Sequence, residues 1–423
     1  MNRILLIASG LACVGVSACA TAGRGPGVTA DPCLVAEGAT DDSIDVLLPA
    51  LPSPGDAPAG AGAVERLVFR QLYATVLRVD CTGALRPGLA VRWSEDDGGR
   101  LWRLELDDRR FADGSPITAQ HIVTRWAREG LAAKQPWLTR VEAPGPRTIA
   151  IRFTEPGPGS LERLADPSLA VAGAEDEHGW PSASGDFTLE HATDSLLVIV
   201  PREGRAPVVR IHRFPSSDGR DQLEAGSDLV VTRDPRTIEY AERVPALAVV
   251  PLPWDRAYFL VSPTIPPLDL PSDSADRARF RESLARDAVQ GSARGAGRDR
   301  LPAPDPACRT GFPAAGRPRN RIVYPAGDLT AQRLAERLVA VAPARLTVAA
   351  LPPAELAESM RTAGDIGFVV PFDPGPAVSC GALPPLPAGA TLEPLVETRA
   401  HLILRRGSAN VTVDADGVPR VRP

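Results

Sequence analysis

Residues 111–126 read FADGSPITAQHIVTRW, and this stretch carries more information about the fold than any other part of the chain. Asp113-Gly114 is a turn-forming pair, and Thr118 belongs to the residue types that cap the start of a helix. Ile122 and Trp126 are four residues apart, so both lie on one face of the helix that should follow. The stretch therefore predicts a turn that leads into an amphipathic helix packed on a larger body.

The composition is that of a folded protein with more than one domain. A length of 423 residues predicts roughly two to three domains. Hydrophobic residues make up 44% of the chain and charged residues 23%, which is typical of globular proteins. The net charge is −5, and acidic and basic residues are mixed without a sustained basic run. Nucleic acid is therefore not expected as a partner, because no face would match its phosphates.

The N-terminal segment has the pattern of an export signal. Arg3 precedes an apolar run from Ile4 to Val16, which is too short for a permanent membrane span. The run closes as VSAC at 16–19, and this closure resembles the lipobox of bacterial lipoproteins, whose cysteine carries the lipid after cleavage. We expect residues 1–18 to be a lipoprotein signal peptide and Cys19 to be lipidated. The alternative is an ordinary signal peptide that is cut near residues 18–22.

An exported, lipid-anchored chain would lie on the extracytoplasmic side of a bacterial membrane, in the periplasm or at the cell surface. Residues 19–42, rich in small and polar residues, are expected to form a tether, with order beginning near Ser43. Four cysteines besides Cys19 would remain in this oxidising compartment: Cys33, Cys81, Cys308 and Cys380. Of the three possible connectivities we favour Cys33–Cys81 and Cys308–Cys380, because these pairs close the shorter loops. Buried free thiols are the alternative.

Strand and helix patterns alternate along the rest of the chain, which predicts an α/β protein. The most regular series is RIVYPA at 321–326, a helix that Thr330 is expected to cap, RLTVAA at 345–350, a helix over 352–362, and DIGFVV at 365–370. This β-α-β-α-β order predicts three parallel strands with right-handed crossovers, forming a domain of its own. Two short strands, 401–405 and 410–413, are expected to return to an earlier sheet.

No pattern of a catalytic or metal site is evident. The five histidines, at 121, 178, 191, 212 and 401, have no spacing of metal ligands, and the nucleophile elbow and the phosphate-binding loop are both missing. The chain is therefore predicted not to be an enzyme and to need no cofactor or metal. An exported protein with several lobes and no catalytic equipment is suited to capturing a ligand.

The opening stretch resembles the F-x-D-G-[ST]-P-[VI]-T-A-x-D-V motif of the family 5 extracellular solute-binding proteins, the peptide, nickel and sugar receptors of ABC importers. Upstream, LRPGLAVRWS at 85–94 and LWRLEL at 101–106 are similar to two further segments of that family, in the same order. The resemblance extends over roughly residues 43–415.

This resemblance implies an α/β fold of the type II periplasmic-binding-protein class, cluster C, with three lobes and a reduced third domain. The boundaries that it implies are 43–65, 184–262 and 395–423 for a discontinuous domain I, 66–183 for domain II and 263–394 for domain III. The reduction is implied by the Pro-rich segment 377–394, which stands where family members have a long helical portion.

The departures from the family concern the ligand. Tyr73-Ala74-Thr75-Val76 stands where relatives carry an acidic residue at the cleft, and Pro371 stands where peptide receptors have the Asp that holds an amino terminus. A ligand ammonium would lose these charge-assisted contacts. The ligand is therefore expected to be a small molecule or peptide-like compound other than a standard peptide with a free amino terminus.

Two functions follow from the resemblance. The first is a monomeric solute-binding lipoprotein that delivers its ligand to the permease subunits of an ABC importer. The alternative is a degenerate binding-protein fold that is retained as an envelope scaffold or interaction lipoprotein. Seven residues are candidates for the ligand site, and packing in the core is the other role open to the aromatic ones: Tyr73, Ser184, Phe187, Trp254, Tyr258, Phe368 and Asp373.

Overall fold

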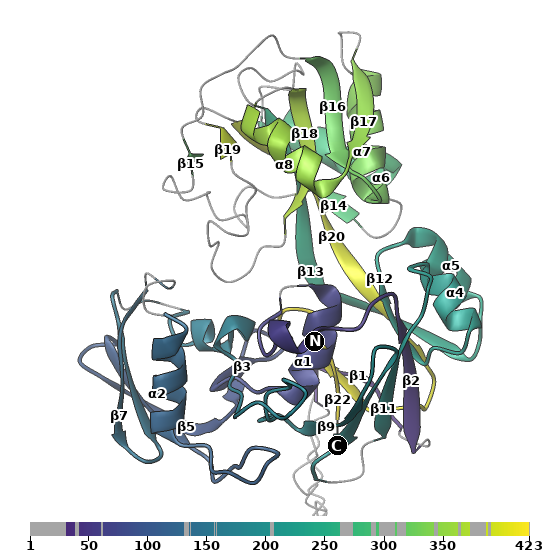
Figure 1. Ribbon diagram of the computed structural model, residues 1–423. Coiled ribbons are helices and arrows are strands. Elements are labelled where there is room, and N and C mark those ends of the chain that lie inside the picture. The colour runs from purple at the N-terminus through teal and green to yellow at the C-terminus, as the bar shows by residue number, and fades with distance from the viewer. Residues whose placement is uncertain are drawn as a thin grey trace, which may run out of the picture. The chain divides into compact units, whose positions relative to one another are not determined.

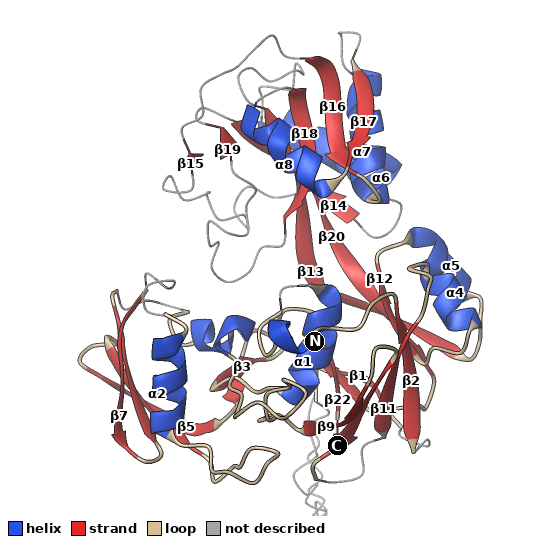
Figure 2. Ribbon diagram, viewed as in Figure 1, coloured by secondary structure: helices blue, strands red, loops and turns tan. Residues whose placement is uncertain are grey.

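The computed structural model describes residues 31–38, 42–60, 62–130, 135, 137–155, 157, 159–203, 207–262, 274–288, 293–295, 309–310, 319–341, 346–362, 365–372, 386–387 and 391–422. These residues form two four-stranded sheets, one seven-stranded sheet and several smaller ones (Figure 1). Helices lie beside the sheets (Figure 2), as the alternating sequence pattern predicts.

The first four-stranded sheet has the strand order β2-β11-β10-β9. Its members are β2 (Ser43–Leu48), β9 (Phe187–Ala192), β10 (Leu196–Pro201) and β11 (Val208–Arg213). Strand β2 is parallel to β11, and the other neighbours are antiparallel. Ile44 and Val46 alternate inward from β2 and share a core with Phe69 and Leu72 of helix α1 (Ala63–Leu72). Such alternation is the pattern of a strand with one buried face.

A three-stranded sheet joins the two ends of the described chain. Its order is β1-β21-β22, from strands β1 (Leu34–Ala36), β21 (Val411–Val413) and β22 (Pro419–Val421). The expected tether is therefore too long, because residues 34–36 pair with β21. The three-residue run LVA is too short to show a period-2 pattern, and a partner far along the chain is what orders it.

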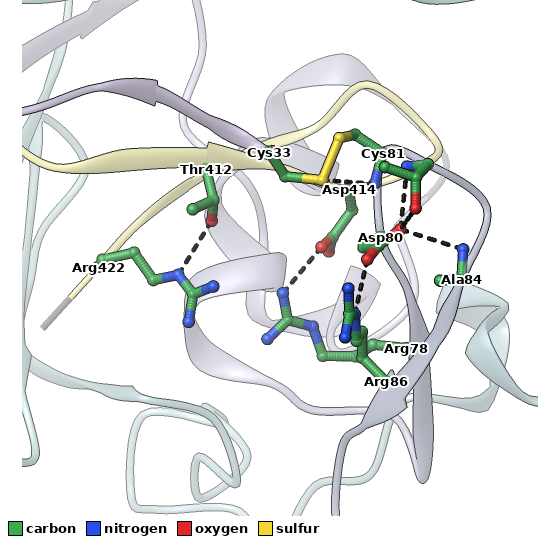
Figure 3. Close-up of a disulfide and its surroundings, with 10 residues drawn as sticks. Cys33, Arg78, Asp80, Cys81, Ala84, Arg86, Thr412, Asp414 and Arg422 are labelled. Carbon is green, nitrogen blue, oxygen red and sulfur yellow. Dashed lines mark hydrogen bonds and ion pairs between the residues drawn. A yellow bond between two sulfur atoms is a disulfide. The ribbon is translucent and has the colours of Figure 1, made fainter. Parts of the chain in front are cut away.

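A disulfide fixes β1 to the next hairpin. Cys33 and Cys81 are bonded with an S–S distance of 2.08 Å (Figure 3), which is the pairing favoured from the sequence. Cys81 directly follows strand β3 (Leu77–Val79) and Asp80, and β3 pairs with β4 (Leu85–Pro87). The other two candidate cysteines, Cys308 and Cys380, lie outside the described residues, and so does Cys19.

The second four-stranded sheet is antiparallel, with the order β5-β6-β8-β7. Its members are β5 (Ala90–Asp96), β6 (Leu101–Leu106), β7 (Leu138–Gly145) and β8 (Thr148–Phe153). Helix α2 (Ala119–Arg128) packs on it and begins where the opening stretch predicts. Thr118 caps it by accepting a hydrogen bond from the backbone N of His121 at 3.1 Å, and Ile122 and Trp126 are buried.

The seven-stranded sheet has the order β12-β20-β13-β18-β16-β17, with β14 paired to β20. Its members are β12 (Leu229–Thr232), β13 (Leu247–Ser262), β14 (Ala293–Gly295), β16 (Arg319–Pro325), β17 (Thr347–Leu351), β18 (Asp365–Phe372) and β20 (Thr391–Arg405). Figure 1 shows β13 and β20 running side by side over their length. Pro251 and Pro253 lie at the point where the register between β13 and β20 shifts.

The predicted β-α-β-α-β series is present, with one correction, to the cap of its first helix. Strand β16 pairs in parallel with β17 and β18, as predicted. The series is not a sheet of its own, because β18 continues through β13 into the larger sheet. Helix α7 (Leu329–Val341) is capped by Asp328, which accepts a hydrogen bond from the backbone N of Ala331 at 2.9 Å, and Thr330 lies inside the helix instead.

Helices cover both faces of these strands. Leu284 of α6 (Ser274–Ala288) and Leu334 of α7 pack with Ile322 of β16, whereas Met360 of α8 (Pro353–Thr362) packs with Val323. Adjacent residues of β16 thus enter separate cores, as they must on opposite faces of one strand. The remaining elements are η1 (Pro54–Asp56), η2 (Glu162–Ala165), η3 (Pro167–Leu169), α4 (Gly219–Glu224), α5 (Pro235–Glu242), β15 (Arg309–Thr310) and β19 (Leu386–Pro387).

Candidate functional site

A cavity of about 390 Å³ lies where strands β2 and β12 end, and we call it the β2/β12 cavity. Leu48-Pro49 at the end of β2 and Thr232-Arg233 at the end of β12 form part of its wall. The two strands are held together, since Asp45 and Asp228 exchange hydrogen bonds of 2.7 and 2.9 Å that involve their backbone N atoms. The carboxyl ends of strands are the usual place for ligands in open α/β sheets.

Five charged residues line the β2/β12 cavity: Arg66, Arg233, Asp255, Arg256 and Asp416. Arg66 lies in the first turn of α1, Arg233 follows β12, Asp255 lies within β13, and Asp416 precedes β22. Arg233 forms an ion pair with Asp255. Asp416 accepts from Arg70 at 2.5 Å. Both carboxylates in the wall of this cavity thus already form ion pairs with arginines of the protein.

A second cavity of about 260 Å³ shares Arg66, Asp255 and Asp416 with the first. Trp254 lies in its wall, and the guanidinium groups of Arg294 and Arg399 lie 4.3 and 4.8 Å from the centre of its ring. Such cation–π contacts hold an aromatic ring in one orientation. The two cavities therefore meet around the bend of β13, where its register with β20 shifts between Pro251 and Arg256.

A buried cluster of charged residues lies beside the second cavity, and Arg78 and Asp414 of this cluster line it. Asp414 accepts hydrogen bonds from Arg78 at 2.8 Å and from Arg420 at 2.5 Å (Figure 3 shows Arg78). Burial opposes ionisation of Asp414, but Arg420 and Arg78 outweigh it and hold the pKa of this carboxyl at about 2. Arg420 also donates to the backbone O of Arg70 at 2.6 Å, so the cluster ties the C-terminal strand to α1.

A third cavity of about 560 Å³ adjoins the first through Thr232 and Arg233. The hydroxyl of Tyr258 donates to the carboxylate of Asp328, with O···O distances of 3.1 and 3.2 Å, and both residues line this cavity. Burial, and next the charge of Asp328, raise the pKa of Tyr258 above its ordinary value. Tyr258 therefore stays a neutral donor that ties β13 to the start of α7.

The structure places the predicted site residues in two groups. Trp254 and Tyr258 line cavities, but Tyr258 is only 1% exposed and belongs to a hydrophobic core. Phe187 and Phe368 are fully buried in two other cores. Asp373 lies outside the described residues.

Tyr73 and Ser184 have internal partners. The hydroxyl of Tyr73 donates to the backbone O of Pro181 at 3.1 Å, and burial raises its pKa. The hydroxyl of Ser184 accepts from the backbone N of Ala74 at 2.9 Å and donates to the backbone O of Val171 at 2.5 Å. Both side chains therefore join segments of the fold to one another.

Sequence reasoning missed Arg66, Arg233 and Asp255. An arginine in the first turn of a helix is a signal that could have pointed to Arg66, because the positive end of the helix dipole disfavours a cation there. Arg233 and Asp255 carried no such signal, since only the fold brings β12 and β13 together.

In the part of the chain that the structure describes, no group of three or more His, Cys, Asp or Glu side chains could hold a metal ion. None of the described helices is long and apolar enough to cross a membrane.

Comparison with known proteins confirms the resemblance seen in the sequence. Residues 84–204 match the family described as bacterial extracellular solute-binding proteins, family 5 Middle. The periplasmic murein peptide-binding protein MppA of Escherichia coli strain K12 is 35% identical over 78 residues, which are 18% of this chain and 14% of MppA. The sequence match thus spans only a small part of that relative.

Solved structures confirm the expected fold class over most of the chain. The structure of the Escherichia coli murein tripeptide binding protein MppA has a TM-score of 0.62 at 15% identity, covering 87% of this chain and 95% of MppA. The structure of NikA from Brucella suis in complex with Fe(III)-EDTA has a TM-score of 0.66 at 14% identity, covering 90% of this chain and 100% of NikA. The chain thus has the fold of these solute-binding proteins.

Proposed function

From the relationship of this chain to the family 5 extracellular solute-binding proteins, we propose that it is the solute-binding component of an ABC importer. It captures a small molecule or peptide-like solute outside the cytoplasm and delivers it, as a monomer, to the permease subunits. The observation that carries the proposal is the β2/β12 cavity of about 390 Å³, which lies at strand ends in a chain with this fold. The division into domains I, II and III given above remains part of the proposal.

The ligand site that we propose differs from the one that the sequence predicts. Trp254 stays in it because it lines a cavity. Tyr258 is 1% exposed and stays in it only as the residue that holds Asp328 in the wall of the third cavity. Arg66, Arg233 and Asp255 are added to it. The buried positions of Tyr73, Phe187 and Phe368 support the alternative that these aromatic residues pack in the core.

A thermal-shift screen of the mature protein against amino-acid derivatives, peptides, sugars, organic acids and metal chelates tests the function. A solute present at 100 times its dissociation constant should stabilise the protein by about 2.7 kcal/mol. Ala63 lines the β2/β12 cavity from the first position of α1 and is exposed, so Ala63→Trp should fill the cavity and abolish the shift. A screen without any stabilising solute would contradict the importer function and leave the scaffold alternative.

We also propose that the protein is a lipoprotein anchored through Cys19, with residues 1–18 removed as its signal peptide. The closure VSAC at 16–19 supports this proposal. The substitution Cys19→Ser should move the protein from the membrane fraction to the soluble fraction, as measured by fractionation and immunoblotting. Membrane retention equal to that of the unaltered protein would overturn the anchor and leave the binding function open.

A further inference from the structure

The two carboxylates that line the β2/β12 cavity have arginine partners, whereas Arg66 in the same wall forms no ion pair among the described residues. Asp255 is paired with Arg233, and Asp416 is paired with Arg70. Arg66 lines both this cavity and its neighbour, and its Nε is buried without a hydrogen-bond partner. Among the described residues no ion pair joins its guanidinium to an acidic group. The wall of the β2/β12 cavity thus contains a guanidinium without an ion pair among the described residues, and the further carboxylates of Glu162 and Asp166 line the neighbouring cavity.

The place of Arg66 in helix α1 adds to this imbalance. The positive end of the helix dipole lies at the first turn, so a cation is disfavoured there and an anion is favoured. Gly62, the N-cap residue, provides no side-chain hydrogen bond to that turn, and Ala63 and Val64 line the cavity beside Arg66. The carboxylate of Glu65 already lies beside Gly62 in that turn, so the attraction for a bound anion comes from Arg66. An arginine that lines a cavity and has no ion pair among the described residues is typical of a functional site.

Two other buried polar atoms indicate which hydrogen-bonding groups the ligand should carry. Nη1 of Arg233 and Oδ1 of Asp255 are buried and have no hydrogen-bond partner. The first atom requires an acceptor and the second requires a donor, because buried polar groups left unpaired cost free energy. Apolar side chains supply much of the remaining wall: Leu48, Val64, Leu67, Leu229 and Leu252.

We propose that the β2/β12 cavity binds an organic acid, with a carboxylate held by Arg66. The ligand also carries a hydroxyl or N–H group that donates to Asp255, and an apolar body that lies against the leucine side chains. A monoanionic carboxylate fits better than a phosphate dianion, because one guanidinium lacks a counter-charge. This inference rests on the proposed function and names the class of solute for the same site.

Matched compounds test this proposal directly. The panel consists of N-acetyl amino acids and 2-hydroxy acids with aliphatic side chains, the primary amide of each acid, and the corresponding amines. Thermal shifts and titration calorimetry are measured with the mature full-length protein at low and high salt. We expect stabilisation by acids, none by the amides or amines, and weaker binding at high salt because the attraction is between charges.

Variants of Arg66 test whether this residue binds the carboxylate of the acid. Loss of a charge-assisted hydrogen bond should raise the Kd of the acid roughly 10- to 100-fold in Arg66→Gln, and Arg66→Lys should recover part of the affinity. The matched control is Arg92→Gln, which removes an exposed arginine that pairs with Glu105 on the β5-β6 strand pair. It should leave the Kd unchanged. Unfolding midpoints without ligand show whether each variant is folded.

The outcomes separate the two proposals. Binding of amides or amines in preference to acids, or acid binding that Arg66→Gln leaves unchanged, would overturn the organic-acid inference while the binding function stands. Failure of every acid, amide and amine to bind, together with an empty broad screen, would overturn the binding function itself.

Discussion

At the scale of single residues, the ion pairs of this protein differ in what they contribute. Arg92 and Glu105 are exposed, and such surface pairs contribute about 0–1 kcal/mol. Asp414 lies between Arg78 and Arg420 with its side chain 7% exposed, so it compensates two largely buried guanidinium groups. Removing one partner of a buried pair is far more costly than removing one of an exposed pair, because the other charge stays behind unpaired.

The substitution Asp414→Asn should therefore lower the free energy of unfolding by about 3–5 kcal/mol. Equilibrium urea unfolding of the mature protein measures the effect. Glu105→Gln is the matched control, and it should change the free energy of unfolding by less than about 1 kcal/mol. A loss for Asp414→Asn as small as that of the control would show that the buried cluster contributes little.

The same carboxyl predicts a dependence of stability on pH. Burial works against the charged form, yet Arg420 and Arg78 lower the pKa of Asp414 from 3.8 to about 2 in the folded protein. A lowered folded pKa means that the contribution of Asp414 is fully present above the unfolded value and is lost as the pH falls from about 4 to about 2. Unfolding free energies of the wild type and Asp414→Asn, measured over this range, should converge at the acidic end. A constant difference between them would contradict the assignment.

At the scale of elements, the disulfide holds β1 in place, because so short a strand forms too few hydrogen bonds to stay paired by itself. β1 has three residues, and among the described strands its one partner is β21, near the other end of the chain. The Cys33–Cys81 bond closes a loop with a sequence separation of 48 residues. For a loop of this size, the chain-entropy model gives a stabilisation of about 4 kcal/mol, and native disulfides typically contribute 2–5 kcal/mol.

Replacing both cysteines, as Cys33→Ser with Cys81→Ser, should lower the free energy of unfolding by about 2–4 kcal/mol. Hydrogen exchange should show the loss of protection first at β1 and β21, whereas α2 and the β5-β6 pair keep theirs. Uniform loss of protection throughout the described chain would mean that the bond stabilises the protein as one unit and does not specifically hold β1.

Elements with local signals were predictable, and elements that depend on distant partners were not. The cap and the buried face of α2 follow from Thr118, Ile122 and Trp126, all within nine residues. β1 could not be recognised, because its partner lies more than 370 residues away. The site shows the same division. Trp254 and Tyr258 were proposed as large aromatic side chains, whereas Arg233 and Asp255 become neighbours only through the pairing of β12 and β13 with β20.

At the scale of the whole molecule, β13 and β20 connect regions that the sequence predicts as separate domains. The lower part of β20, His401–Arg405, pairs with β12 and with the start of β13. The upper part of β13, Ala257–Val261, pairs with β18. Tyr258 and Leu260 belong to the same core as Leu334 of α7. The strands β16, β17 and β18 therefore obtain one edge and part of their core from residues outside 263–394.

The predicted domain III, produced alone as residues 263–394, should therefore fail to fold cooperatively, because it lacks β13 and most of β20. A longer fragment, residues 247–405, contains both strands complete and should unfold in a cooperative transition. Circular dichroism during urea unfolding distinguishes the two fragments, since an unpaired sheet edge and an uncovered core leave no sharp transition. A sharp transition in the shorter fragment would show that domain III is autonomous, and that β13 and β20 join two independently stable parts.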